Sequence, residues 1–307
     1  MRKERILISG GSGLIGRKLT ELLLKDNYEV AWLSRSRGNG NVPIYKWDID
    51  KKIIDKEAIA FADHIIHLAG KNVFEGKWTD KMKAEIMKSR VKSAELLIDQ
   101  IRQNGKHINT FISASGIGYY GADTGNLIVD ESSPHGNDFI SEVVQKWENK
   151  VNEVSLLGVR TVIFRIGVVL ALDDGALPKI IIPVKLGIGA PLGTGKQFMS
   201  WIHINDLCNI YQHAIRDNNL QGVFNAVAPY PVTNREFTQI LSKVLNKPFF
   251  MPNVPSMVLK MIFGNEKSSL VLGGNKVSSK KLSDTGYKFE YPELEKALNN
   301  LLSTDRG

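Results

Sequence analysis

Short apolar runs alternate with amphipathic stretches through most of the chain. Seven runs rich in Val, Ile, Leu and Phe predict strands, at residues 5–9, 29–34, 44–47, 64–68, 110–115, 160–169 and 223–226. Most of these runs are apolar throughout, as expected of strands that helices cover on both faces. Between them, apolar residues three and four apart predict helices, the first of which carries Ile15, Leu19 and Leu22 on one face. This alternation predicts an α/β fold with a doubly wound parallel sheet.

The last third of the chain is predicted to be mainly helical. Thr233 and Glu236 have the spacing of a capping box, and apolar residues follow them at helical intervals. Pro255 can begin a second apolar helix that Gly264 ends, and Pro292 can begin a terminal one. We expect these helices to form a smaller region that covers a substrate.

Composition narrows the class of protein. The 307 residues are 43% apolar and 23% charged, which is ordinary for a globular protein and excludes disordered and collagen-like chains. The net charge of +8 comes without any recognisable nucleic-acid-binding motif. We therefore interpret most lysines as solvated surface residues, with an anionic ligand as the alternative.

Two further features bear on where the protein works. The single cysteine, Cys208, cannot form an internal disulfide, which fits a reducing compartment. The apolar run Ile180–Ile182 is far shorter than the about 20 residues that span a bilayer. We expect a cytoplasmic protein, a monomer or homodimer, that binds neither membranes nor nucleic acid.

Three spaced glycines, Gly10, Gly13 and Gly16, follow the first predicted strand directly and open the first predicted helix. One residue without a Cβ permits the tight turn, a second lets the backbone approach a diphosphate, and a third lets the helix pack closely on the strand. The helix N-terminus then offers free N–H groups and a positive dipole end to phosphates. In this strand–turn–helix context the pattern predicts a dinucleotide-binding domain of the Rossmann type.

The end of the second predicted strand selects between NAD(H) and NADP(H). A site for NAD(H) usually has an acidic residue there, which holds the adenosine ribose. The run at residues 33–37 is Leu-Ser-Arg-Ser-Arg and contains no acid. Arg35 can grip a 2′-phosphate with help from Ser34 or Ser36, whereas the alternative is a solvent-facing arginine. We predict NADP(H) as the cofactor.

Other nucleotide and metal sites are not indicated. The glycine-rich run at residues 187–196 has Ala190 where a P-loop needs its first glycine, and Gln197 where it needs Ser or Thr. No pair of histidines has the spacing of zinc ligands, and there is no Gly-x-Ser-x-Gly motif. We therefore expect no bound metal.

The motifs divide the chain into two expected units. The NAD(P)-binding Rossmann domain is expected from residues 1–166 and about 200–228. The smaller region that covers the substrate is expected from about 167–199 and 229–307.

With these residues in view, the sequence resembles the extended and atypical short-chain dehydrogenase/reductase superfamily. It is most similar to the nucleoside-diphosphate-sugar epimerase-like branch, members of the NAD(P)-dependent epimerase/dehydratase family with their own C-terminal domain. The resemblance runs nearly end to end. Besides the glycine turn, it rests on the motifs at residues 67–70, 85, 88–91, 113–115, 118–121, 147–148, 165–170, 193–197, 201–204, 228–229, 281–282 and 286–287.

The resemblance implies cofactor contacts at five places. The diphosphate would be held by the turn, at Gly10, Ser12, Gly13, Leu14, Ile15 and Gly16, and the 2′-phosphate by Ser34 and Arg35 at the end of the second strand. The adenosine would lie against Leu68, Ala69 and Gly70 at the end of the fourth strand, and the nicotinamide against Gly167, Val168 and Val169 at the end of the sixth. Glu85 and Arg90 on the long helix would make further contacts with the cofactor.

The catalytic pair of the wider superfamily is absent. Its members use a Tyr, whose phenol pKa is lowered by a Lys four residues later, together with a Ser. None of the eight tyrosines has Lys at that spacing, and Lys146 on the expected helix is two or three residues out of register. The remaining catalytic candidates are Ser115, Tyr119 and Tyr120; the alternative is that Ser115 caps the strand and both tyrosines pack under the region that covers the substrate. We expect Glu142 and Glu148 to be a surface residue and a structural contact.

These observations predict an NADP(H)-dependent oxidoreductase or epimerase-like enzyme. Its substrate is expected to be a small carbonyl compound or sugar, which can be nucleotide-linked. The alternative is a module that binds NADPH and regulates a partner without turnover, because the Tyr/Lys pair is missing.

Overall fold

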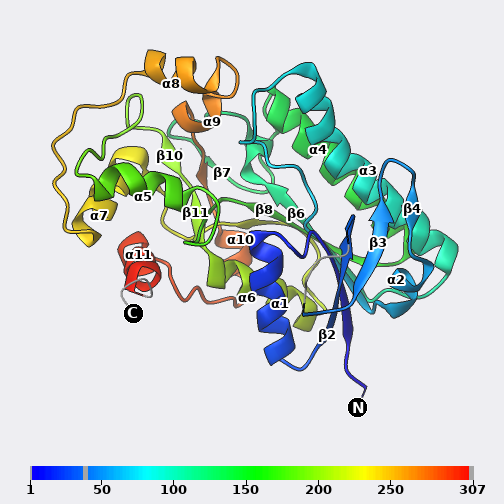
Figure 1. Ribbon diagram of the computed structural model, residues 1–307. Helices are drawn as coiled ribbons and strands as arrows, with labels where there is room; N and C mark the ends of the chain where they lie inside the picture. Colours follow the sequence, from blue (N-terminus) through cyan, green and yellow to red (C-terminus); the bar gives the residue numbers. More distant parts are fainter. Residues whose placement is uncertain (1, 37–40, 304–307) are drawn as a thin grey trace.

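A computed structural model describes residues 2–36 and 41–303, which fold around an eight-stranded sheet (Figure 1). The strand order is β12-β8-β6-β5-β1-β2-β3-β4, and every neighbouring pair is parallel except β3 and β4. The strands are β1 (Arg5–Ser9), β2 (Glu29–Ser34), β3 (Ile44–Asp48), β4 (Ile53–Ile54), β5 (His64–His67), β6 (Thr110–Gly116), β8 (Arg160–Ile166) and β12 (Gly222–Ala226). The predicted doubly wound Rossmann-type sheet is confirmed.

Helices cover both faces of this sheet because its strands are apolar on both sides. Along β1, Ile6 and Ile8 face one core and Leu7 faces the other. The first core is covered by α1 (Leu14–Lys25) and α6 (Ile204–Arg216), and the second by α2 (Lys56–Phe61), α3 (Asp80–Asn104) and α4 (Phe139–Asn152). Short 3-10 helices, η1 (Ile117–Tyr120) and η2 (Glu153–Leu157), follow β6 and α4.

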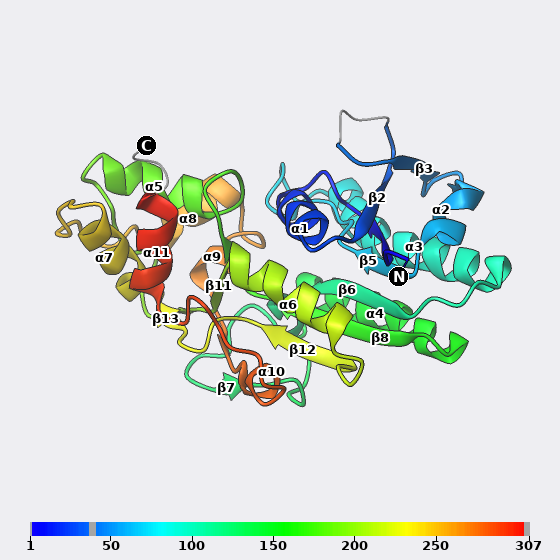
Figure 2. The ribbon, with the colours of Figure 1, turned by 90° about the horizontal axis from the view of Figure 1, so that it is seen from below.

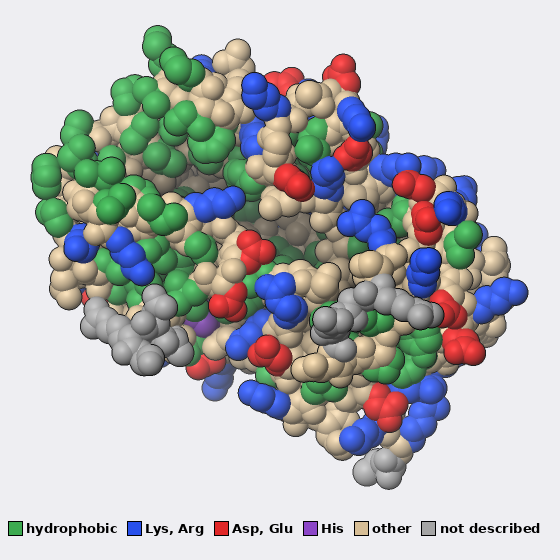
Figure 3. Space-filling model, viewed as in Figure 1, with side chains coloured by type: hydrophobic (Ala, Val, Ile, Leu, Met, Phe, Trp, Pro, Cys, Tyr) green, Lys and Arg blue, Asp and Glu red, His purple; other side chains and the backbone are tan. Residues whose placement is uncertain are grey.

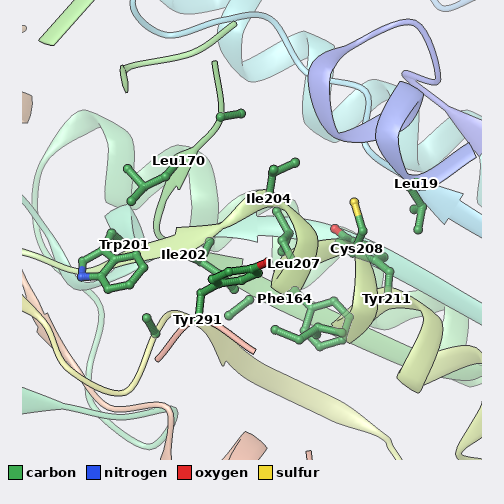
Figure 4. Packing of buried hydrophobic residues seen from close by; sticks show 14 of the residues in the cluster. Leu19, Phe164, Leu170, Trp201, Ile202, Ile204, Leu207, Cys208, Tyr211 and Tyr291 are labelled. Atoms are coloured by element: carbon green, nitrogen blue, oxygen red, sulfur yellow. The ribbon is translucent and has the colours of Figure 1, made fainter. Parts of the chain in front are cut away.

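Large aromatic side chains fill the first core where α6 meets the sheet (Figure 4). The rings of Phe164 and Tyr211 meet edge to face with their centres 5.1 Å apart, and both side chains are fully buried. Trp201 is buried in the same core, on the other side of Tyr291 from Phe164 (Figure 4). Tyr291, from the C-terminal part of the chain, stacks on His203 at 4.0 Å. This core therefore joins the sheet to the C-terminal helices.

The remaining elements lie together at the end of the molecule opposite α2 and α3 (Figure 2). The predicted capping box at Thr233 and Glu236 is present, and Pro255 and Gly264 flank a helix as predicted. These elements are β7 (Ile128–Val129), β9 (Val168–Leu170), α5 (Leu177–Lys185), β10 (Phe198–Met199), β11 (Trp201–His203), β13 (Val232–Thr233), α7 (Asn234–Val244), α8 (Ser256–Phe263), α9 (Ser269–Leu272), β14 (Lys276–Val277), α10 (Lys280–Ser283) and α11 (Leu294–Ser303).

The single strand predicted over residues 160–169 is wrong, because the structure has two strands there. β8 ends at Ile166 in the main sheet, and β9 begins at Val168 and pairs with β11 instead. The N–H of Gly167 still reaches Ala226 O, at 3.2 Å, but a Cβ on Gly167 would lie 2.5 Å from Ser200 O. The glycine therefore lets the chain leave the sheet and lead into the C-terminal elements.

Candidate functional site

The turn after β1 has the geometry that its glycines predict. Gly10 adopts a positive φ of 76°, and a Cβ there would lie 2.9 Å from the backbone of Leu68 and Ala69. A Cβ on Gly16 would lie 2.5 Å from Gly10 O, so α1 can approach the strand only because this residue is glycine. Gly13 is the N-cap of α1 and provides no side-chain cap, and the first turn contains no acidic residue. The N–H groups at this helix start therefore meet no competing carboxylate of their own helix.

This turn lies where the strand order reverses, between β1 and β5. In open α/β sheets, ligands bind outside the carboxyl ends of the strands at such a point. A buried hydrogen-bond chain fixes the two strand ends here: Ser9 Oγ lies 2.6 Å from His67 Nδ1, and Ser93 Oγ of α3 lies 3.1 Å from His67 Nε2. Burial lowers the pKa of His67 to about 3, so the imidazole is neutral and bridges the two hydroxyls.

Ser34 and Arg35 stand at the carboxyl end of β2, the neighbour of β1. Ser34 is the last strand residue and is partly exposed, and the Arg35 side chain is exposed to solvent. Arg37, the last residue of the predicted run, lies outside the described residues. The exposure of Arg35 leaves it accessible to a charged ligand at this end of the sheet.

Arg90 of α3 contacts the loop that follows β5. Arg90 Nη1 donates to Lys71 O at 3.0 Å and to Ile86 O at 3.2 Å, and its guanidinium lies near Gly70, where a Cβ would be 3.1 Å from Cζ. Burial lowers the pKa of Arg90 to about 10. Glu85 forms an ion pair with Lys71, and that hydrogen bond lowers the pKa of the carboxyl. Both predicted contact residues of α3 thus support the loop containing Ala69 and Gly70.

At the end of β6, Ser115 belongs to a buried ionic network rather than to a free strand end. Ser115 Oγ donates to Glu148 Oε1 of α4 at 2.5 Å. Arg165 of β8 donates to the same carboxylate through Nε at 2.9 Å and through Nη2 at 2.8 Å. The Glu148 and Arg165 side chains are only 6% and 4% exposed. Burial opposes the charge on Arg165, but the hydrogen bonds and charge of Glu148 outweigh it and raise the pKa of the guanidinium.

The network continues into the two tyrosines of η1. Arg165 Nη1 donates to Tyr120 Oη at 3.1 Å, and Tyr120 Oη donates to Asn225 Oδ1 of β12 at 2.7 Å. Burial raises the pKa of Tyr120 to about 12, against the lowering effect of Arg165. The Arg165 guanidinium also lies 3.3 Å from the centre of the Tyr119 ring. One cation therefore positions both predicted tyrosines.

The network distinguishes the three predicted hydroxyls by whether each already donates its proton within the protein. A hydroxyl carries one proton to donate, and Ser115 and Tyr120 give theirs to Glu148 and Asn225. Tyr119 is partly exposed, and its hydroxyl has no hydrogen-bond partner among residues 2–36 and 41–303. Of the three, Tyr119 is the one whose proton is uncommitted.

Sequence reasoning missed Arg165 and assigned Glu148 only a structural contact. Glu142 and Lys146, by contrast, form an exposed ion pair on α4, as expected from the register. Glu148 lies six residues beyond Glu142 and is buried by the sheet. The only signal for Arg165 was a charged residue inside an otherwise apolar strand, and such a charge requires a buried partner.

Contacts from the C-terminal elements cross to the Rossmann part beside this site. Lys267 Nζ donates to Phe74 O at 2.6 Å and to Gly76 O at 2.7 Å, and Asn275 Nδ2 donates to Gly121 O at 2.9 Å. The surface is hollowed between the C-terminal helices and α3 and α4 (Figure 3). A separate cavity of about 570 Å³ lies between α1, α6 and α11, and Leu14 is the only predicted site residue in its lining.

Comparison with known proteins places this geometry in a family. Residues 6–227 match the model of the NAD dependent epimerase/dehydratase family, and residues 254–301 match a domain of unknown function, DUF1731. The epimerase family protein SDR39U1 of Mus musculus is 36% identical over 303 residues, which cover 97% of this chain and 100% of that protein. The epimerase family protein YfhF of Bacillus subtilis is 32% identical, covering 97% and 98%.

Solved structures agree with the sequence relatives. The crystal structure of human SDR39U1 (isoform 2) with NADPH has a TM-score of 0.87 and 34% identity, covering 97% of this chain and 99% of that chain. No helix in the described part of the chain has the length and apolarity needed to cross a bilayer. From its sequence motifs, its sheet and these matches, the chain belongs to the NAD-dependent epimerase/dehydratase family, as its resemblance predicted.

Proposed function

We propose that this chain binds NADP(H) and is an oxidoreductase or epimerase-type enzyme acting on a small carbonyl or sugar substrate, which can be nucleotide-linked. The observation that carries the proposal is the uncapped, acid-free start of α1 at the point where the strand order reverses. Human SDR39U1, with the same fold over nearly its whole length, crystallises with NADPH, which supports the choice of cofactor.

The residues around this point fit a dinucleotide. Gly10 and Gly16 have no space for a Cβ, and a Cβ on Gly13 would come 3.3 Å from Gly10 O, so the three glycines keep the backbone of the turn open to a diphosphate. Arg35, exposed beside Ser34, can pair with a 2′-phosphate in a bidentate manner. Gly167 and Val168, where the chain leaves the sheet, would lie at the nicotinamide end.

When bound, the cofactor supplies or accepts a hydride. The chain must then place a proton donor or acceptor opposite it. We assign that role to Tyr119 Oη, because Ser115 and Tyr120 already donate their protons within the protein. Arg165 stands in the place of the missing Lys as a fixed cation, held by Glu148, and its contact with the Tyr119 ring keeps the phenol in position.

Calorimetric titration tests the cofactor. Arg35→Glu removes a charge-assisted contact with the 2′-phosphate, worth about 1.5–3 kcal/mol, and should weaken NADPH binding about 10- to 100-fold while NADH binding changes little. Arg102→Glu makes the same charge change at an exposed ion pair near the end of α3 and should leave both affinities unchanged. Tighter binding of NADH than of NADPH by the unaltered protein would contradict the choice of cofactor.

The missing Tyr/Lys pair and the committed protons of Ser115 and Tyr120 favour a second candidate, a noncatalytic module that binds NADPH and regulates a partner. Oxidation of NADPH across a panel of carbonyl compounds and nucleotide sugars separates the two. For the enzyme, Tyr119→Phe should lower turnover at least about 100-fold without weakening NADPH binding. Tyr230→Phe, at a tyrosine that is 61% exposed, is the matched control. Tight NADPH binding without turnover on any substrate would support the regulatory module.

A further inference from the structure

Large apolar side chains are exposed together on the C-terminal elements. Six of them, just after α5, in the segment after α7 and on α8, are at least half exposed. We call this set the apolar face: Leu186, Ile188, Phe250, Met257, Met261 and Ile262. Exposed apolar residues are ordinary when scattered singly, whereas a group of this kind marks a surface that something covers.

The segments that carry the apolar face lie against one another. The N–H of Gly193 donates to Val254 O at 2.9 Å, and the N–H of Val254 donates to Pro191 O at 2.8 Å. A Cβ on Gly187 would lie 3.8 Å from Pro248 Cγ. Figure 3 shows the result: hydrophobic side chains predominate over the end of the molecule formed by α5, α7 and α8. The segments that carry the six residues therefore lie side by side at this apolar end of the molecule.

Within the segments around the apolar face every charged residue is a lysine, and acidic residues stand only at their borders, at Asp174, Asp206, Glu236 and Glu266. Residues 175–205 and 237–265 contain six lysines and no Asp, Glu or Arg. Lys179, Lys196 and Lys260 are among them, and all six lysines are exposed. Lys243 pairs with Glu295 of α11 at 2.7 Å. The cations that these segments offer to an anionic partner are therefore mainly Lys179, Lys196, Lys247 and Lys260.

We propose that the apolar face rests on the surface of a membrane that contains anionic phospholipids. Apolar side chains that enter the acyl boundary, next to lysines that meet the headgroups, are what interfacial binding requires. A second copy of this chain fits less well. In a twofold interface the face would meet itself, and Lys179, Lys196, Lys247 and Lys260 of both copies would converge with no acidic residue inside either segment to pair with them.

The proposal differs from the expectation, made from the sequence, that the protein binds no membrane, because pattern reading along the chain does not reveal this surface. The face is assembled from segments separated by α6, β12 and α7, and none of them has an apolar run long enough to suggest a membrane. The inference does not depend on the proposed enzyme activity, because it concerns a different surface of the molecule.

Co-sedimentation with vesicles tests the proposal. The full chain should sediment with vesicles of phosphatidylcholine mixed with phosphatidylglycerol, should sediment far less with phosphatidylcholine alone, and should be released by added salt. Met261→Asp should weaken binding to the mixed vesicles about 10- to 100-fold, because the variant lacks one apolar side chain that the membrane would otherwise bury. Leu156→Asp is the matched control: Leu156 is 83% exposed, Met261 is 81% exposed, and both substitutions change the net charge equally. Leu156→Asp should bind like the unaltered protein.

Three results would overturn the proposal. They are no binding to either vesicle, equal binding to both, and equal loss in the two variants. Light scattering after size exclusion adds a further test without lipid. A dimer that Met261→Asp dissociates and Leu156→Asp does not would assign the apolar face to a second copy instead. Because both side chains are exposed, unchanged thermal midpoints confirm that each variant is folded.

Discussion

Replacing Glu148 with Gln tests the buried network most sharply. The substitution keeps the shape of the side chain but removes the charge that faces Arg165, which donates two hydrogen bonds to this carboxylate. With both side chains less than about a tenth exposed, little solvent can replace the lost partner. Removing one member of such a pair leaves an uncompensated buried charge and costs about 3–5 kcal/mol. For a chain of 307 residues, that should lower the thermal midpoint by about 5–8 °C.

Glu142→Gln is the control for this prediction. It removes the same charge from the same helix, at a pair with Lys146 whose side chains are 53% and 54% exposed, and should cost less than about 1 kcal/mol. Replacing Glu148 and Arg165 together with Met should cost less than the sum of the two single replacements, because no unpaired charge remains. Differential scanning calorimetry measures all five variants: the two Gln variants, the two single Met variants and the double Met variant. Equal midpoints for Glu148→Gln and Glu142→Gln would refute the network's contribution to stability.

Three further predictions follow from the structure. Buried His67 and His203 have pKa values lowered to about 3 and about 4, chiefly by burial, so the unfolded chain takes up protons below pH 6.5 that the folded chain does not. Each histidine should lower the free energy of unfolding by about 2 kcal/mol as the pH falls from 6.5 to 5, with little change above pH 6.5. Urea denaturation midpoints at pH 7 and pH 5 measure this loss, and equal midpoints would be incompatible with it. Thr233→Ala removes the cap of α7, where Thr233 Oγ1 accepts from the Glu236 N–H at 3.2 Å, and should cost about 1 kcal/mol in urea denaturation; no change would exclude a stabilising cap. Gly13→Asp should abolish NADPH binding in calorimetry without lowering the thermal midpoint, because Asp is a favourable N-cap but its carboxylate repels the diphosphate; retained binding would contradict the proposed cradle.

The fold could be predicted from the sequence because the apolar strands are buried in the sheet and the amphipathic helices cover it, as their residue patterns indicate. The apolar strands and the amphipathic first helix lie where the periodicity indicates, and the turn at Gly10 has the positive φ that a strand-to-helix turn requires. The strand break at Gly167 was missed because residues 160–169 are apolar and β-branched on both sides of it. The choice of a new partner, β11, depends on backbone contacts with Ser200 that no local pattern records.

The cofactor candidates and the catalytic candidates differ in how far the sequence could lead. The glycine turn is a local motif whose geometry follows from missing Cβ atoms, so its placement could be predicted. The partners of Ser115, Tyr120 and Arg165 come from α4 and β12, as far as 105 residues apart in the chain. Only tertiary packing brings these groups together, so the sequence could not distinguish the committed hydroxyls from the free one on Tyr119.

A crystal structure of this chain grown with NADPH is the most direct test of the account. We predict that the diphosphate lies against the backbone between Gly10 and Gly16, with the 2′-phosphate within hydrogen-bond reach of Arg35. A diphosphate bound elsewhere, or an empty turn at saturating NADPH, would contradict the claim that this strand–turn–helix holds the cofactor.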